Sequence, residues 1–158
     1  MTQLVALVDS VIQEAEWYVH LNDGDIGAHI WFRGVTRATT VLNGDRTRIQ
    51  QTETLYYEAH RPMAEAGLQQ LADSAVQRFD VRHVVIVHRL GEVPVGQCSV
   101  LVGCGSAHRS ACIEAVAWIM DTLKQEIPIW KQERFQSGST CWVHPGADEP
   151  DGTGMNDC

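Results

Sequence analysis

Apolar residues recur at helical spacing in two stretches of the 158-residue chain. The first lies between positions 62 and 79, and its repeating positions are Ala64, Leu68, Leu71, Ala75 and Phe79. The second predicts a helix over about 107–126, capped by Ser106 and closed by Pro128. Its repeating positions are Cys112, Val116, Ile119, Met120 and Leu123. Such spacing places apolar side chains on one helical face, so both stretches predict amphipathic helices.

Runs of β-branched and aromatic residues predict strands. They cover positions 4–8, 26–32, 52–58, 82–90 and 97–105. Alternation along the fourth run places His88 and Arg89 on opposite faces, so we expect one to be buried and the other exposed.

The remaining segments are predicted to be short or irregular. A short helix capped by Ser10 is expected over 10–18, a mobile loop over 38–48, and a turn over 91–96. After a small N-terminal unit, the order is β-β-α-β-β-α, with strands in hairpin-like pairs and helices on one face. This order predicts an α+β fold.

Length and charge restrict the function further. The length fits one domain, placed at 1–143, followed by an acidic tail at 144–158 that we expect to be disordered. Twelve Lys and Arg residues against twenty Asp and Glu give a net charge of −8, which argues against nucleic-acid binding. The sequence shows no apolar run of about 18 residues and no signal-peptide pattern, so we expect a cytoplasmic protein that does not bind membranes.

Five cysteines raise the alternative of a metal or redox protein. The closest group of possible zinc ligands is Cys98, Cys104, His108 and Cys112. However, Cys98 and Cys104 lie on one predicted strand, where six residues span about 20 Å. Two ligands of one zinc ion cannot be that far apart, so we expect no metal site.

The only two lysines of the chain, Lys124 and Lys131, flank Pro128. Lys124 follows Met120 by one helical turn, at the edge of the buried stripe. Lys131 follows the helix break, so the chain can fold back toward Lys124. A lysine in such a position can act as an acid, a base or a nucleophile. The alternative is that two surface lysines lie close together by chance.

Candidate anion-binding residues lie elsewhere. Arg37 follows a predicted strand, while His108 and Arg109 begin the second helix, where backbone N–H groups favour an anion. Ordinary solvated side chains are the alternative. The sixteen helical residues from His108 to Lys124 span about 24 Å. These two residues can therefore share a small site only if a second subunit supplies one of them.

Five motifs in order give a family resemblance. They are FxGxxR at 32–37, YEAxxxMAE at 57–65, HRxGxxxxG at 88–96, SAHR at 106–109 and DxLKxxxPIWKxE at 121–133. From about Gly27 to Val143 the chain resembles the large, catalytic subunit of molybdopterin synthase. The resemblance implies an α/β hammerhead-like α+β domain with a small additional subdomain.

The family resemblance also implies a reaction and its partners. The reaction is sulfur transfer to cyclic pyranopterin monophosphate, which forms the dithiolene of molybdopterin. The sulfur comes from a thiocarboxylate on the C-terminal Gly-Gly of a small ubiquitin-like subunit. Large subunits form a homodimer within a heterotetramer, and no cofactor or metal is needed.

Roles for individual residues follow from the resemblance. Lys124 would contact the thiocarboxylate and the reacting carbon, and Lys131 would assist by proton transfer. Arg37, His108 and Arg109 match substrate-anchoring positions, the last two reaching in from the neighbouring subunit. The remaining expected substrate-binding residues, within these motifs or directly before one, are Phe32, Val35, Thr36, Met120, Gln132 and Glu133.

One departure from the family pattern motivates an alternative function. Cys141 stands where the family often has arginine. The loss of that charge could weaken binding of phosphate or of the partner's tail. The alternative is a catalytically weakened paralogue that acts as a binding or assembly module for a ubiquitin-like partner.

Overall fold

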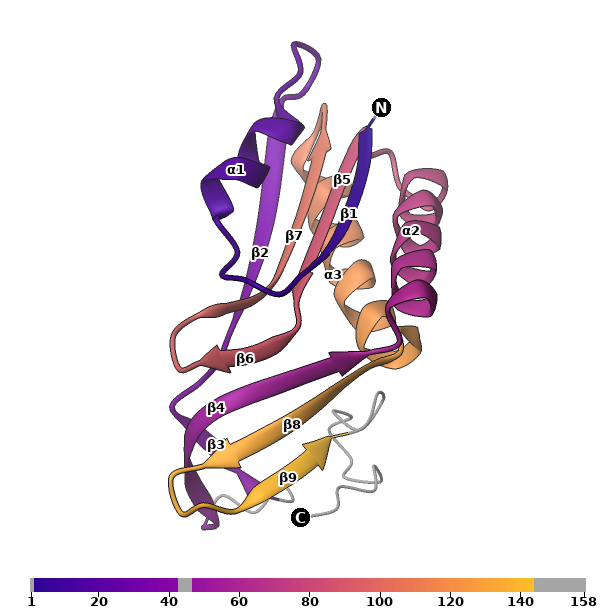
Figure 1. Ribbon diagram of the computed structural model, residues 1–158. Coiled ribbons are helices and arrows are strands. Elements are labelled where there is room, and N and C mark those ends of the chain that lie inside the picture. The colour runs from indigo at the N-terminus through magenta and orange to yellow at the C-terminus, as the bar shows by residue number, and fades with distance from the viewer. Residues whose placement is uncertain (1, 43–46, 144–158) are drawn as a thin grey trace.

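The computed structural model describes residues 2–42 and 47–143 and contains two sheets, the first of which has four strands. The strand order of this first sheet is β1-β5-β7-β2 (Figure 1). The strands are β1 (Thr2–Val8), β5 (His83–Arg89), β7 (Cys98–Ser106) and β2 (Ala28–Val35). β1 runs parallel to β5, whereas the β5–β7 and β7–β2 pairs are antiparallel. The four strands lie close to their predicted positions, and the predicted antiparallel pair of 82–90 with 97–105 is confirmed as β5–β7. The other predicted pair, 26–32 with 52–58, was wrong, because β2 pairs with β7 and the strand over 52–58 belongs to a second sheet.

A second sheet, of five strands, lies at one end of the first (Figure 1). It contains β3 (Thr39–Val41), β4 (Ile49–Ala59), β8 (Ile129–Phe135) and β9 (Thr140–Val143), with β6 (Gly91–Pro94) paired to β4. The chain passes from β5 to β6 at Gly91, whose φ of 77° would strain the backbone of a residue with a side chain. The two sheets and their helices confirm the α+β class, and the second sheet is the small additional unit.

Two long helices cover one face of the first sheet. They are α2 (Arg61–Arg78) and α3 (Arg109–Glu126), and the main core lies between them and the sheet. On the opposite face, α1 (Glu14–Tyr18) and the 3-10 helix η1 (Val19–Leu21) carry Trp17 and Leu21 onto β5 and β7. The two long helices therefore lie on one face, as expected, and the N-terminal unit covers the other.

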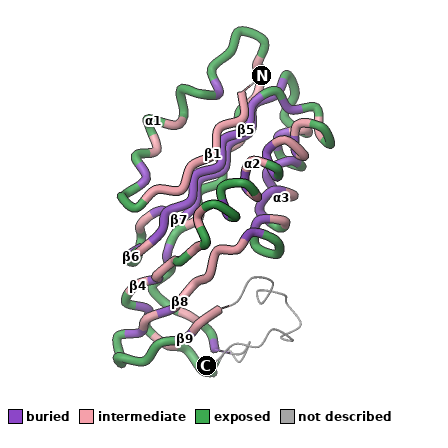
Figure 2. Tube along the Cα trace, turned by 45° about the vertical axis from the view of Figure 1, so that its right-hand side comes forward, coloured by how far each residue is buried: buried purple, intermediate pink, exposed green. Residues whose placement is uncertain are grey.

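The two central strands, β5 and β7, are buried along their whole length (Figure 2). His88 is 4% exposed and Arg89 is 9% exposed, although they point to opposite faces. The expectation that one of them would be exposed was therefore wrong, because both faces of the sheet are covered at this point. An Arg89 guanidinium N–H donates to Gln97 Oε1 at 2.6 Å.

Several predicted local features differ from the structure. Gln13, not Ser10, precedes α1, so the helix begins four residues later than predicted. His108, not Ser106, is the N-cap of α3, because Ser106 ends β7 and donates its hydroxyl proton to Asp80 O. The predicted turn over 91–96 contains β6, and the predicted loop over 38–48 contains β3.

Other expectations agree with the structure or fall outside it. α3 ends at Glu126, two residues before Pro128, as predicted. The expected disordered tail at 144–158 lies outside the described residues, as do positions 43–46 of the predicted loop. Within the described part of the chain, no helix is long and apolar enough to cross a membrane.

Candidate functional site

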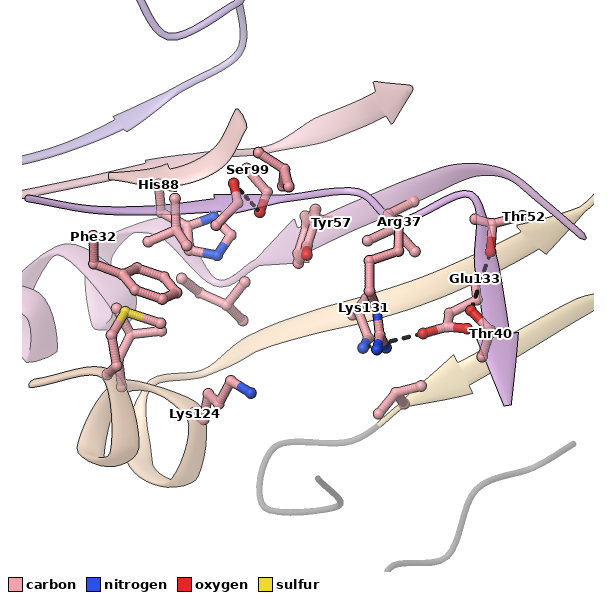
Figure 3. Close-up of a pocket in the computed structure, with 18 residues that line it drawn as sticks. Phe32, Arg37, Thr40, Thr52, Tyr57, His88, Ser99, Lys124, Lys131 and Glu133 are labelled. Carbon is pink, nitrogen blue, oxygen red and sulfur yellow. Dashed lines mark hydrogen bonds and ion pairs between the residues drawn. The ribbon is translucent and has the colours of Figure 1, made fainter. Parts of the chain in front are cut away.

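A cavity of about 490 Å³ is lined by residues of both sheets and by the C-terminal part of α3 (Figure 3). Phe32 lies at one end (Figure 3), and Val100, Met120, Leu123 and Ile129 are further apolar residues of the lining. The other end is polar, formed by Arg37, Thr40, Thr52, Lys131 and Glu133. A cavity with such separated surfaces suits a ligand that has an apolar or aromatic part and an anionic part.

The structure brings the two lysines to this one cavity. Lys124 lies in the last turn of α3, and Lys131 lies on β8, after the chain has turned away from the helix around Pro128. Lys131 Nζ is 3.1 Å from Glu133 Oε1. Residues two apart on a strand share a face, so β8 directs both side chains into the cavity. The fold-back expected from the sequence is therefore present.

Glu133 is the most buried charged residue of the cavity, at 5% exposure. A buried carboxylate is costly unless a cation or hydrogen-bond donors compensate it. Lys131, whose side chain is 21% exposed, supplies that compensation. The pair therefore holds the Lys131 amine in a defined position within the cavity.

Four other expected site residues also line the cavity. Phe32 and Val35 come from β2, Arg37 follows that strand, and Met120 comes from α3. Arg37 extends into the polar end, which also contains Lys131 and Glu133 (Figure 3). A guanidinium beside an ammonium group favours the binding of an anion such as phosphate.

Four expected substrate-binding residues do not line the cavity, and two of them, Thr36 and Gln132, lie close to lining residues in the sequence. Thr36 is 2% exposed, and its hydroxyl donates to Val93 O at 2.9 Å. Gln132 alternates with Lys131 and Glu133 on β8, so its side chain lies on the other face of the strand. There Gln132 Oε1 accepts a hydrogen bond from Arg134 Nε at 2.8 Å. Thr36 therefore ties the segment before Arg37 to β6, and a substrate contact by either residue stays a prediction.

His108 and Arg109 lie at the far end of α3 from Lys124 and are exposed. Because α3 is one unbroken helix, the separation of about 24 Å expected from the sequence holds in the structure. Within one subunit they cannot contact a small ligand that touches Lys124. Their role through a second subunit stays a prediction.

The sequence interpretation missed a polar group in the middle of the cavity. Tyr57, His88 and Ser99 line it, and the Tyr57 and His88 rings meet edge to face with centroids 4.9 Å apart. Burial lowers the pKa of His88 to about 4, so its imidazole is neutral near pH 7. Tyr57 and His88 each stand in a recognised motif, and this was the signal that could have identified them.

The cysteines form no metal site in the described residues. Within 2–42 and 47–143, no group of three or more His, Cys, Asp or Glu residues could hold a metal ion. Cys98, Cys104 and Cys112 are free and buried. Burial raises the pKa of all three thiols, that of Cys104 to about 12. A cysteine binds zinc as its thiolate, so these surroundings disfavour metal binding by the three.

The comparisons with known proteins agree on one family. The family model described as MoaE protein matches residues 7–126, more than half of the chain. The molybdopterin synthase catalytic subunit of Dictyostelium discoideum is 34% identical over 85% of this chain and 82% of its own length. That of Nostoc sp. is 41% identical over 73% and 72% of the two chains. The chain spans about half the length of the bovine, human and rat relatives that it matches at 42–44% identity.

Solved structures share the fold. Molybdopterin synthase from Staphylococcus aureus superposes with a TM-score of 0.76 and 29% identity, over 86% of this chain and 93% of that one. The MoaE protein of Burkholderia ambifaria has a TM-score of 0.71 at 26% identity, over 96% and 95% of the two chains. The complex of subunits 1 and 2 of molybdopterin-converting factor from Helicobacter pylori, at 17% identity and a TM-score of 0.68, shows the fold alone. The family model and the full-length relatives together show that this chain belongs to the MoaE family.

Proposed function

We propose that this chain is the catalytic subunit of a molybdopterin synthase. It transfers sulfur from the C-terminal thiocarboxylate of a small ubiquitin-like subunit to cyclic pyranopterin monophosphate, and so forms the dithiolene. The observation that carries the proposal is the meeting of Lys124, Lys131, Arg37 and Glu133 at one cavity. Membership of the MoaE family supports it, because curated relatives are named as this subunit.

The cavity suggests a division of roles. Lys124 contacts the thiocarboxylate and the reacting pterin carbon, as an acid–base group or as a transient covalent partner. Lys131, held by Glu133 at 3.1 Å, assists with proton transfer and stabilises developing negative charge. Arg37 anchors the phosphate. The sulfur arrives already activated on the partner, so the proposed reaction needs no metal or cofactor.

A homodimer would complete the site. His108 and Arg109 lie about 24 Å from Lys124 along α3, too far to share a small ligand with it in one subunit. In the proposed homodimer they bind the substrate that lies at Lys124 of the neighbouring subunit. Mixed dimers test this arrangement. A dimer with Arg109→Ala in one subunit and Lys124→Ala in the other retains one intact site and is expected to regain about half of the wild-type activity. No recovery in isolated mixed dimers would contradict a site shared between subunits.

The proposed partner is a small subunit that ends in Gly-Gly. The related complex from Helicobacter pylori contains two different subunits of molybdopterin-converting factor, in agreement with such a pairing. We place the reaction in the cytoplasm, the location expected from the sequence.

The alternative proposal is a binding module that has lost most of its activity. Its basis is Cys141, which stands at a usual arginine position. Cys141 is 3% exposed and packs with Leu42 and Phe135, and it does not line the cavity. The change therefore leaves the lysines, Arg37 and Glu133 in place, which favours the enzyme.

Turnover distinguishes the two proposals. Purified chain is mixed with cyclic pyranopterin monophosphate and with the small subunit in its thiocarboxylate form. The enzyme is expected to form molybdopterin, and the control with the unmodified carboxylate form is expected to give none. Partner binding without product would favour the binding module.

A further inference from the structure

His88 has a defined tautomer. Its Nδ1 lies 2.9 Å from the backbone oxygen of Arg89, and a carbonyl oxygen can only accept a hydrogen bond. Nδ1 therefore carries the proton and donates it. The ring is neutral near pH 7, because burial lowers its pKa to about 4. It follows that Nε2, at the tip of the ring away from the backbone, carries a lone pair and is a hydrogen-bond acceptor.

The position of the ring is fixed from several sides. His88 is 4% exposed, yet it lines the cavity. The Tyr57 ring contacts it edge to face, with an interplanar angle of 73°. Val100 is its cross-strand partner on β7. An acceptor held this firmly has little freedom left to lose when a ligand binds.

Aromatic side chains flank His88 within the cavity. Its ring lies between those of Phe32 and Tyr57 (Figure 3). Phe32 packs closely over Gly34, where an added Cβ would be 3.3 Å from Phe32 Cε1. The charged groups Arg37, Lys131 and Glu133 are at the other end. This end therefore suits a planar heterocycle, and the other end suits the anionic part of the same molecule.

We infer that His88 is a positioning residue that accepts a hydrogen bond, through Nε2, from a ring N–H or amino group of the heterocyclic substrate. This inference rests on the proposed function, because the heterocycle is the pterin of that reaction. The hydrogen bond fixes the orientation of the heterocycle next to His88 and so sets which carbon faces the lysines. The backbone N–H groups of the partner's Gly-Gly tail offer the same donor chemistry, so the test includes both ligands.

Two substitutions separate the two nitrogens of His88. The amide nitrogen of His88→Asn can take the place of Nδ1 and keep the bond to Arg89 O, but nothing replaces Nε2. The amide oxygen of His88→Gln can take the place of Nε2 and remain an acceptor, but the bond to Arg89 O is lost. His83→Gln is the matched control, because His83 lies at the other end of β5, pairs with Asp23 and does not line the cavity.

Steady-state kinetics with the thiocarboxylated small subunit give the first result. For the pterin, His88→Asn is expected to raise KM about tenfold with kcat within about twofold, since a donor of the substrate loses its acceptor. His88→Gln is expected to stay within about threefold of wild type. The reverse order would show that His88 acts only through its bond to Arg89 and would overturn the inference.

Binding measurements identify the ligand. By calorimetry, His88→Asn is expected to weaken binding of the pterin alone and to leave binding of a tail peptide ending in Gly-Gly unchanged. Weakening of the peptide alone would overturn the assignment to the heterocycle. Turnover by the wild-type protein tests the proposed function independently, so failure of the His88 inference leaves that function standing.

Ring-nitrogen spectra do not depend on the folding of a variant. In wild-type protein labelled with ¹⁵N-histidine, the Nε2 resonance of His88 is expected to move when the pterin is added. The Nδ1 resonance is expected to stay in place. An Nε2 resonance that does not move at a saturating pterin concentration would also overturn the inference.

Discussion

Buried His88 makes the stability of the protein depend on pH. Burial lowers the pKa of this imidazole from 6.5 to about 4. Between these two values the unfolded chain binds a proton that the folded chain excludes. Falling pH therefore stabilises the unfolded state relative to the folded state. The contribution of neutral His88 is complete above pH 6.5 and is lost as the pH falls toward 4.

The magnitude follows from the difference between the two pKa values. The interval is about 2.5 pH units, and each unit corresponds to about 1.4 kcal/mol. The free energy of unfolding is thus expected to fall by about 3 kcal/mol across the interval from this group alone. That is a large part of the stability of about 5–15 kcal/mol typical of a protein.

Urea unfolding at a series of pH values from 7 to 4.5 measures this effect. Wild type is compared with His88→Gln and with His29→Gln, which removes an exposed histidine. Wild type and His29→Gln are expected to lose stability in parallel, whereas His88→Gln loses about 2–3 kcal/mol less across the range. Glu14, whose pKa is lowered by its hydrogen bond from Arg33, contributes equally in all three proteins. Equal slopes for wild type and His88→Gln would refute the reasoning.

Three further predictions concern the cavity. Gly34→Ala brings a Cβ to 2.6 Å from Val100 Cγ1. It is expected to lower the free energy of unfolding by about 1–3 kcal/mol, whereas Gly24→Ala, with nothing within 4 Å, leaves urea unfolding unchanged. Glu133→Gln removes the carboxylate that lies 3.1 Å from Lys131 Nζ. It is expected to lower the single-turnover rate constant of product formation by at least about tenfold. An unchanged rate constant would contradict the positioning of Lys131 by Glu133. Arg37→Ala is expected to raise KM for the phosphate-bearing substrate about tenfold or more, with partner binding unchanged by calorimetry.

The long helices and the central strands could be predicted because their burial is regular. α2 and α3 each bury one face, so their apolar residues recur at helical spacing. β5 and β7 are buried on both faces and are almost continuously apolar. In these elements the local pattern and the tertiary surroundings agree.

The strands around the cavity could not be predicted in the same way. On β8, Lys131 and Glu133 face inward because that face lines a polar cavity. The usual alternation of apolar inward and polar outward residues is therefore absent. β6 has four residues and β3 has three, and each is held by pairing with β4, which is distant from β6 in the sequence. Local propensity carries little information about such pairing.

The site was predicted in part. The motif around Pro128 identified both lysines, and the helix end explains why they meet. His88 was missed because strand alternation describes only the direction of a side chain. Whether both faces are covered depends on α1, η1 and α3, which are distant in the sequence.

The most direct test of the central claim is molybdopterin formation by Lys124→Ala with the thiocarboxylated small subunit. Lys124 is exposed, so its truncation is expected to leave the fold intact. We predict that the rate of product formation falls at least about 100-fold relative to wild type. A Lys124→Ala protein that forms molybdopterin at nearly the wild-type rate would contradict the claim that this cavity carries out sulfur transfer through Lys124.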